Sequence, residues 1–251
     1  MKSDDFLNAH IFQVDVEAQT NASLRDSLTS LVCELRTALR AAIPNSTVSF
    51  DLAIEPEYPA IARGYDFPAL SHCLDTIVPM AYDMVDGGKA ANSPLPAVLG
   101  GIEEYRNLSI PLSKLNVALP WYGYDIVCDS LAPSELCTPP VAFPNRQIGL
   151  GQILDLHRSS GNPTIVLHED SVCKSFDYIE HNSSSGAVMW RRRVTYDDNE
   201  TLHRKYSAVL AQGVGGVGIW TADASHRYRP SDTRVLAASM WESVRRATHP
   251  R

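Results

Sequence analysis

The chain has 251 residues, of which 44% are hydrophobic and 20% are charged, and its formal net charge at pH 7 is −7. Such a length suits one large α/β domain or two small ones. The acidic balance, with one short arginine run at residues 191–193, excludes the broad basic surface of a nucleic-acid-binding protein. No stretch of about twenty apolar residues is present to span a membrane, so we expect neither nucleic acid nor membrane as a partner.

The first predicted strand covers residues 10–17, and its side chains alternate between two faces. After Ile11, the polar face holds Gln13, Asp15 and Glu17, and the apolar face holds Phe12, Val14 and Val16. Val- and Ile-rich segments paired with helices follow, which favours a parallel sheet covered on its outside. Carboxylates on the inner face of such a sheet are costly unless they are paired or used chemically. Asp15 and Glu17 are therefore the first candidate functional residues.

Strand and helix patterns alternate along the rest of the chain. Strands are predicted at residues 48–54, 76–83, 115–122 and 215–220, and helices at residues 23–42, 95–107, 202–212 and 231–248. Strand followed by helix, repeated five times, predicts an α/β fold of the (β/α)8 TIM-barrel type, incomplete because five units cannot close eight strands. A doubly wound open sheet would fit the same count, but no glycine-rich phosphate loop follows the first strand.

Residues 125–195 interrupt this alternation. They contain a short helix at residues 150–158 and β-like runs at residues 164–168, 176–180 and 187–195, the last two forming a hairpin. We interpret this region as a small α+β insertion before the last strand.

Polar and aromatic side chains gather at the predicted carboxyl ends of the strands, where barrels build their active sites. They are Asp15, Glu17, Glu55, Tyr82, Asp83, Trp121, Tyr122 and Trp220. Carboxylates with aromatic faces suit a site that cleaves sugars, because acids protonate the glycosidic oxygen and rings stack on the pyranose. The alternatives are that the aromatic rings are core residues and that a strand-end aspartate caps a helix.

Five cysteines and five glycosylation sequons indicate an oxidising compartment. Cys128 and Cys137 bracket a short loop with Pro and Ser, which predicts a disulfide. We expect Cys33 to be a buried thiol within a helix, and Cys73 and Cys173 have no evident partners. The sequon asparagines are Asn21, Asn45, Asn107, Asn182 and Asn199. They favour the secretory route, although Asn, Ser and Thr also collect in turns and caps.

No cysteine or histidine spacing is typical of a metal site, so we expect no metal and no cofactor. The first residues, Met-Lys-Ser-Asp-Asp, lack the apolar core of a signal peptide. For a chain with glycoprotein features, we expect that the natural N-terminus is missing.

Several motifs, in the right order, resemble glycoside hydrolase family 18, the chitinase family, whose catalytic strand carries the signature DxxDxDxE. Residues 13–17, Gln-Val-Asp-Val-Glu, resemble the end of that strand. Residues 80–83, Met-Ala-Tyr-Asp, resemble the family's sixth-strand motif. Residues 120–125, followed by Cys128 and Cys137, are most similar to the chitobiase branch, and the run ending at Trp220 resembles the last landmark. The resemblance implies that residues 1–251 form a partial catalytic domain, about strands 4–8.

The resemblance also implies a mechanism and roles. In this family the substrate's own 2-acetamido group attacks the anomeric carbon, so no enzyme nucleophile is needed. By motif, Glu17 is the acid and later the base, Asp15 orients the acetamido group, and Tyr82 donates a hydrogen bond to the acetamido oxygen. Further substrate contacts are implied for Asp83, Trp121, Tyr122 and Trp220. The implied substrate is β-1,4-linked N-acetylglucosamine (GlcNAc), in the chitobiose core of N-glycans or in chitin oligosaccharides, and we expect a monomer that is lysosomal or secreted.

The chain also departs from the family pattern. The outermost aspartate of the signature falls at His10 and the middle one at Gln13. The first three barrel strands are expected to be absent, which would leave an open hydrophobic edge. Two hypotheses result: a chitobiase-like hydrolase, or a catalytically inactive truncated or carbohydrate-binding chitinase-like protein. An unrelated α/β binding domain is a third and weaker interpretation.

Overall fold

The computed structural model describes residues 11–84, 91–128, 137, 146–182, 184–222 and 230–249. The chain divides into two compact units. The first consists of Met1–Met80, Leu99–Val117 and Gln212–Gly218, and the second of Ala81–Val98, Ala118–Ala211 and Ile219–Arg251. Within the described ranges, no helix combines the length and the apolar character needed to cross a membrane.

The elements follow one another in nearly the order that the sequence predicts. The strands are β1 (Ile11–Val14), β2 (Thr47–Ala53), β3 (Thr76–Met80), β4 (Asn116–Pro120), β5 (Tyr122–Cys128), β6 (Arg146–Gly149), β7 (Val166–His168), β8 (Cys173–His181), β9 (Val188–Tyr196) and β10 (Gly216–Trp220). The helices are α1 (Ala22–Ala42), α2 (Pro59–Ala62), α3 (Phe67–Cys73), α4 (Leu95–Asn107), the 3-10 helix η2 (Leu112–Lys114), α5 (Leu150–Ser159), α6 (Asn199–Leu210) and α7 (Pro230–Thr248).

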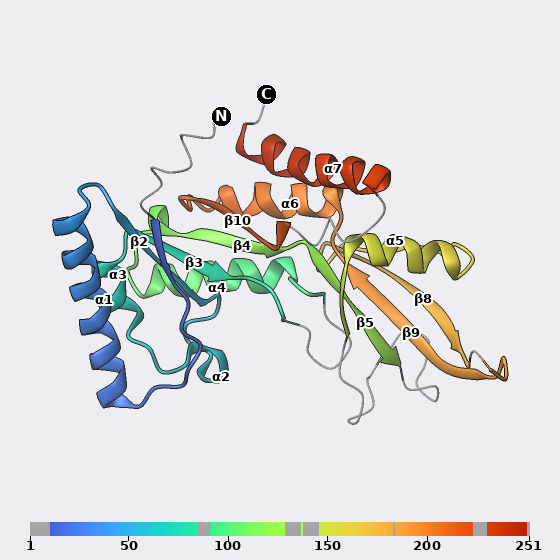
Figure 1. Ribbon diagram of the computed structural model, residues 1–251, viewed down its shortest axis with the longest axis horizontal. Helices are drawn as coiled ribbons and strands as arrows, with labels where there is room; N and C mark the ends of the chain where they lie inside the picture. The colour runs from blue at the N-terminus through green and yellow to red at the C-terminus, as the bar shows by residue number, and fades with distance from the viewer. Residues whose placement is uncertain are drawn as a thin grey trace. The chain divides into compact units, whose positions relative to one another are not determined.

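One sheet has the strand order β1-β2-β3-β4-β10, in which β1, β2 and β3 run parallel (Figure 1). Strand β2 is buried on both faces, as expected for a strand between two parallel neighbours. Phe50 and Leu52 point to one face and are fully buried, while Ser49 and Asp51 point to the other. The α/β fold with a parallel sheet confirms the predicted fold class.

Strand β1, Ile11–Val14, is shorter than the predicted residues 10–17. Pairing of β1 with β2 ends at Val14, opposite Phe50, so Asp15 and Glu17 follow the strand instead of lying within it. The reason is that the carbonyl oxygens of Val16 and Ala18 accept hydrogen bonds from the Tyr65 hydroxyl and not from a neighbouring strand. His10, the first residue of the predicted strand, lies outside the described residues.

A disulfide joins Cys33 of α1 to Cys73 of α3, with a Cα–Cα distance of 4.9 Å. The expectation that Cys33 is a free thiol and that Cys73 lacks a partner was therefore wrong. The two helices pack against each other, which brings together cysteines 40 residues apart in sequence (Figure 1). Each helix begins at a side-chain cap: Asn21 accepts from the Leu24 amide, and Asp66 accepts from the Ala69 amide.

In the second unit, an antiparallel sheet has the strand order β6-β5-β9-β8-β7. The hairpin of β8 and β9 agrees with the sequence, whereas β5 and β6 were not predicted. Strand β5 shows no two-residue alternation because both of its faces are buried. Gly123 lies where β5 meets β9, and a Cβ at this position would clash with the Thr195 carbonyl oxygen. The boundaries 125–195 for an inserted domain remain a prediction.

Buried polar side chains and a disulfide stabilise this antiparallel sheet. Asp125, fully buried on β5, accepts hydrogen bonds from Arg192 at 2.8 Å and from the Tyr178 hydroxyl at 3.0 Å, and it pairs with Arg146. The disulfide predicted between Cys128 and Cys137 is present, with a Cα–Cα distance of 4.5 Å, and it packs with Ile126 in a small apolar cluster. The remaining cysteine, Cys173, is a buried free thiol.

Candidate active site

The acidic group of the first unit lies in the segment after β1. Asp15 and Glu17 are both exposed, which fits side chains that meet a ligand and does not fit core residues. Glu17 Oε1 lies 3.3 Å from Arg63 Nη2 in an ion pair. The structure therefore holds Glu17 next to a cation that the sequence analysis did not connect with it, because Arg63 lies 46 positions further along the chain.

The backbone on either side of Glu17 is fixed by residues around Arg63. The Tyr65 hydroxyl donates to the carbonyl oxygens of Val16 at 2.7 Å and of Ala18 at 3.0 Å. The Thr20 amide and hydroxyl both donate to the Arg63 carbonyl oxygen at 2.9 Å. Gly64 has a φ of +71°, and a Cβ there would lie 2.8 Å from the Thr20 carbonyl oxygen. Only glycine fits this close approach without strain.

Tyr65 connects this segment to the core of the first unit. Its ring is 8% exposed and lies against Phe50 at 6.0 Å and Phe67 at 6.4 Å between centroids. Burial raises the pKa of Tyr65, so the hydroxyl remains a donor at neutral pH. Because its ring is packed in the core, Tyr65 holds the backbone on either side of Glu17 in a fixed position.

Tyr65→Phe is expected to lower kcat by roughly ten- to a hundredfold in any reaction that uses Glu17, because small misplacements of a catalytic group are costly. Loss of the two hydrogen bonds is expected to reduce the free energy of unfolding by about 1–3 kcal/mol. Tyr105→Phe is the matched control, since the buried Tyr105 hydroxyl donates to the Ala53 carbonyl oxygen at 2.6 Å, on β2 and away from Glu17. Urea denaturation should show a similar loss for both variants, and equal kcat losses in the two variants would contradict the positioning role.

Asp51 on β2 is a third acidic residue of the first unit, one that the sequence did not point to. It is 7% exposed, and the Gln13 amide nitrogen donates to its two oxygens at 2.6 and 2.7 Å. Burial, with the negative charges of Asp15 and Glu17, raises the pKa of Asp51 to about 6, against the opposing effect of the Gln13 hydrogen bond. The available signal in the sequence was a single charge in the otherwise uncharged strand of residues 47–53.

A group of three aromatic side chains, Tyr82, Tyr122 and Trp220, belongs to the second unit; we call it the aromatic group. Tyr82 lies parallel to Trp220, with ring centroids 6.1 Å apart and an interplanar angle of 13°, and it meets Tyr122 edge-on at 6.4 Å. Trp220 is 46% exposed, so a large apolar ring is open to solvent. The Trp121 amide donates to the Trp220 carbonyl oxygen at 2.7 Å, and the peptide bond from Trp220 to Thr221 is cis. An exposed indole that lies against the parallel Tyr82 ring is suited to stacking on a sugar ring.

Asp83 is held by three neighbours of the same unit. Its Oδ1 accepts hydrogen bonds from the hydroxyls of Tyr122 and Tyr124, the latter at 2.6 Å. Burial and the bond to Asp83 raise the pKa of both phenols well above the ordinary value, so they remain donors. The Asp83 amide in turn donates to the side-chain oxygen of the buried Asn92 at 2.7 Å. Tyr124 and Asn92 were missed because neither stands at a predicted strand end.

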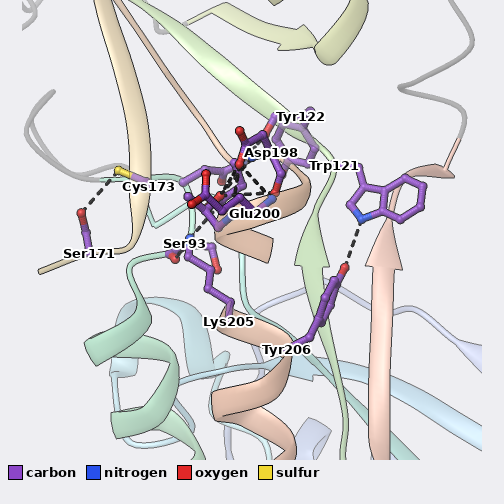
Figure 2. Close-up of polar contacts among 12 residues, drawn as sticks. Ser93, Trp121, Tyr122, Ser171, Cys173, Asp198, Glu200, Lys205 and Tyr206 are labelled. Atoms are coloured by element: carbon purple, nitrogen blue, oxygen red, sulfur yellow. Dashed lines mark hydrogen bonds and ion pairs between the residues drawn. The ribbon is translucent and has the colours of Figure 1, made fainter. Parts of the chain in front are cut away.

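Trp121 is a core residue and not the sugar platform that the sequence analysis expected. Its indole nitrogen donates to the Tyr206 hydroxyl at 3.0 Å (Figure 2). Its ring is fully buried and meets Trp241 edge-on, with 5.1 Å between the ring centroids. A ring without exposed surface cannot stack on a ligand. Tyr122 is 3% exposed and touches the site through Asp83, so its contribution to binding is indirect.

Four of the five sequon asparagines, Asn21, Asn45, Asn107 and Asn199, are exposed, and Asn182 is partly exposed. Their modification remains a prediction. Among the residues that the structure describes, no three His, Cys, Asp or Glu side chains gather closely enough to hold a metal ion.

Comparison with known proteins gives a family. The sequence profile described as "Glycosyl hydrolases family 18" matches residues 7–225. Di-N-acetylchitobiase of Mus musculus is 25% identical over 244 residues, covering 92% of this chain and 66% of its own length. The Homo sapiens protein of that name is 25% identical over 248 residues, covering 92% of this chain and 62% of its own length. Probable di-N-acetylchitobiase 2 of Dictyostelium discoideum is 35% identical over 255 residues, covering 92% and 63%.

Solved structures show the same fold. A chitinase from Chromobacterium violaceum superimposes with a TM-score of 0.72 at 18% identity, covering 96% of this chain and 67% of its own. A class V chitinase from Nicotiana tobaccum gives a TM-score of 0.72 at 21% identity, covering 92% and 68%. The chain spans 62–66% of the length of the three curated relatives named above. Its match to the profile extends over most of its residues, and the chain belongs to family 18 of the glycosyl hydrolases.

Proposed function

We propose that this chain carries the catalytic residues of a glycosidase that hydrolyses β-1,4-linked GlcNAc, in chitobiose cores or chitin oligosaccharides, with substrate-assisted retention of configuration. The observation that carries the proposal is the pair Asp15 and Glu17, retained in a family 18 chain and held in an exposed segment with a fixed backbone. Names of the relatives, di-N-acetylchitobiase and chitinase, support the substrate class.

The proposed reaction has two steps. In the first, the carbonyl oxygen of the substrate's 2-acetamido group attacks the anomeric carbon while Glu17 gives its proton to the departing glycosidic oxygen, which leaves as an alcohol. Asp15 orients the acetamido group and stabilises the positive charge of the oxazolinium ion. In the second, Glu17 takes a proton from water as that water attacks the anomeric carbon, which restores the acetamido group and the protonated acid.

The aromatic group is proposed to bind the sugar. Tyr82 donates a hydrogen bond to the acetamido oxygen, Asp83 accepts one from a sugar hydroxyl, and Trp220 forms the surface beneath the ring. Support comes from the parallel Tyr82 and Trp220 rings, from the exposure of Trp220, and from the two tyrosine hydroxyls that hold Asp83. We further propose a lysosomal or secreted monomer modified at the five sequons, supported by the two disulfides, which form in oxidising compartments.

One observation favours a second candidate, a carbohydrate-binding protein without activity. A general acid must be free to reach the glycosidic oxygen, whereas Glu17 is held by Arg63 in an ion pair at 3.3 Å. In the active protein, binding of substrate would have to separate these two side chains.

The test is to incubate the chain with chitobiose and follow the anomeric protons by NMR. The glycosidase proposal expects release of GlcNAc as the β-anomer first, and no hydrolysis of cellobiose, which lacks the acetamido group. Release of the α-anomer first would contradict the mechanism. Binding of chitobiose in calorimetry without any release would favour the second candidate.

A further inference from the structure

Asp83, the residue proposed to accept a hydrogen bond from the sugar, has an unusual backbone conformation. It follows β3, which ends at Met80, and its φ of +59° lies in the left-handed region that residues other than glycine seldom adopt. The hydroxyls of Tyr122 and Tyr124 donate to its carboxylate, which does not by itself fix the backbone. Other groups must therefore hold the backbone of Asp83 in this conformation.

Asn92 supplies the contacts that hold this backbone. Its side-chain oxygen accepts a hydrogen bond from the Asp83 amide at 2.7 Å, and its own carbonyl oxygen accepts one from the Met84 amide at 3.1 Å. Its side-chain nitrogen donates to the Tyr122 carbonyl oxygen, on β5, at 3.2 Å. Asn92 is 1% exposed, so water does not compete for these bonds. One amide side chain thus joins the backbone of Asp83 to the first residue of β5.

Ser93, the residue after Asn92, anchors these contacts to α6. Its carbonyl oxygen accepts a hydrogen bond from the Lys205 ammonium at 2.5 Å (Figure 2). Lys205 also forms an ion pair with Asp197 at 2.7 Å, and all three residues are at most 1% exposed. Hydrogen bonds from a charged donor are roughly twice as strong as those between neutral groups. Displacing Ser93 would cost the buried ammonium such a bond, so its carbonyl group is held firmly.

We propose that Asn92 is a positioning residue for Asp83, and that the buried ion pair of Lys205 with Asp197 fixes Asn92 through the adjoining carbonyl group. This inference rests on the proposed role of Asp83 in binding the sugar. All of these residues belong to the second unit, and each link between them is a hydrogen bond, an ion pair or a peptide bond. Because the ion pair is buried, it acts on sugar binding through Asp83 and not by contact with the sugar.

The first experiment needs no substrate. Hydrogen exchange of the Asp83 amide is measured by NMR as a ratio to that of the Trp121 amide, which donates to the Trp220 carbonyl oxygen at 2.7 Å and serves as the reference for opening of the unit. Asn92→Ala removes the acceptor, and we expect this ratio to rise about tenfold. Ser243→Ala, which removes a buried hydroxyl on α7, should leave the ratio unchanged. A ratio in Asn92→Ala equal to that of the wild type would overturn the inference.

A double variant tests the anchor and separates positioning from stability. Lys205→Met with Asp197→Asn leaves no unpaired charge, but the ammonium that holds the Ser93 carbonyl oxygen is gone. We expect the Asp83 amide to exchange about fivefold faster against the same reference, while the variant still unfolds cooperatively. Lys174→Met, which removes the ammonium of a less buried ion pair, should keep the wild-type ratio. A wild-type ratio in the double variant would show that the buried pair only adds stability, and would overturn its anchoring role.

The consequence for binding is measured by calorimetry with chitobiose in the Glu17→Gln background, in which the sugar is expected to bind without being cleaved. Asp83→Ala and Asn92→Ala should each raise the dissociation constant about tenfold. Together they should also raise it about tenfold, because Asn92 acts through Asp83. Ser243→Ala should leave the dissociation constant unchanged. Single effects that multiply to about a hundredfold in the double variant would overturn the inference.

The outcomes separate this inference from the proposed function. If the Glu17→Gln chain does not bind chitobiose, the proposed function fails, and hydrogen exchange alone still decides whether Asn92 and the buried ion pair position Asp83. If chitobiose binds but Asn92→Ala leaves the exchange ratio of the Asp83 amide unchanged, the inference fails and the proposed function stands.

Discussion

Glu17→Gln is expected to lower kcat for chitobiose by about 10²–10⁴-fold, the usual contribution of a general acid. The amide has nearly the same shape as the acid, but it can neither give a proton to the leaving oxygen nor take one from water. Its oxygen can still accept from Arg63, which lies 3.3 Å from Glu17, and Tyr65 still holds the flanking backbone. The dissociation constant for chitobiose in calorimetry should therefore stay within about threefold of the wild type.

Glu34→Gln is the matched control for this experiment. It makes the same chemical change at an exposed position of α1 and should leave kcat unchanged. A Glu17→Gln variant that retains more than about a tenth of wild-type kcat would remove Glu17 from the role of acid. If activity and affinity were lost together with the cooperative unfolding transition, the role of Glu17 would be structural.

Lys205→Met is expected to reduce the free energy of unfolding by about 3–5 kcal/mol, the usual cost of leaving one partner of a buried ion pair alone. Lys205 on α6 is fully buried, and its ammonium donates to the Ser93 carbonyl oxygen at 2.5 Å (Figure 2). It also donates to Asp197 at 2.7 Å. Methionine fills a similar volume but supplies no charge. Asp197, which is 1% exposed, would then be ionised without a cation or take up a proton.

Lys174→Met is the control, because Lys174 pairs with Asp198 at 2.6 Å and with Glu200 at 2.8 Å where water still reaches the carboxylates. We expect a loss below about 1 kcal/mol, as for other exposed ion pairs. Adding Asp197→Asn to Lys205→Met should recover about 1 kcal/mol or more in urea denaturation, since it removes the unpaired charge. A loss below about 1 kcal/mol in Lys205→Met alone would contradict a buried pair.

Local patterns in the sequence predicted most elements well. The helix predicted at residues 95–107 is α4 with the same ends, and those at residues 23–42 and 231–248 begin one residue earlier as α1 and α7. Helical spacing, caps and stop signals are encoded in neighbouring residues, so they can be read without the fold. Strand β5 was missed for the opposite reason, because burial on both faces leaves no alternation to detect.

In the candidate site, too, some features could be predicted from the sequence and others required the tertiary structure. The sequence by itself determined the family motifs, the retained Asp15 and Glu17, and the disulfide between Cys128 and Cys137, whose partners are nine positions apart. Only the tertiary structure joined Cys33 to Cys73, Tyr65 to the backbone beside Glu17, and Gln13 to Asp51, and only it buried Trp121. The contacts between residue pairs join positions 38 to 49 residues apart in the sequence. The burial of Trp121 depends on which residues pack over its ring. Strand register and the path of the chain determine such contacts, and the spacing of neighbouring residues in the sequence determines neither.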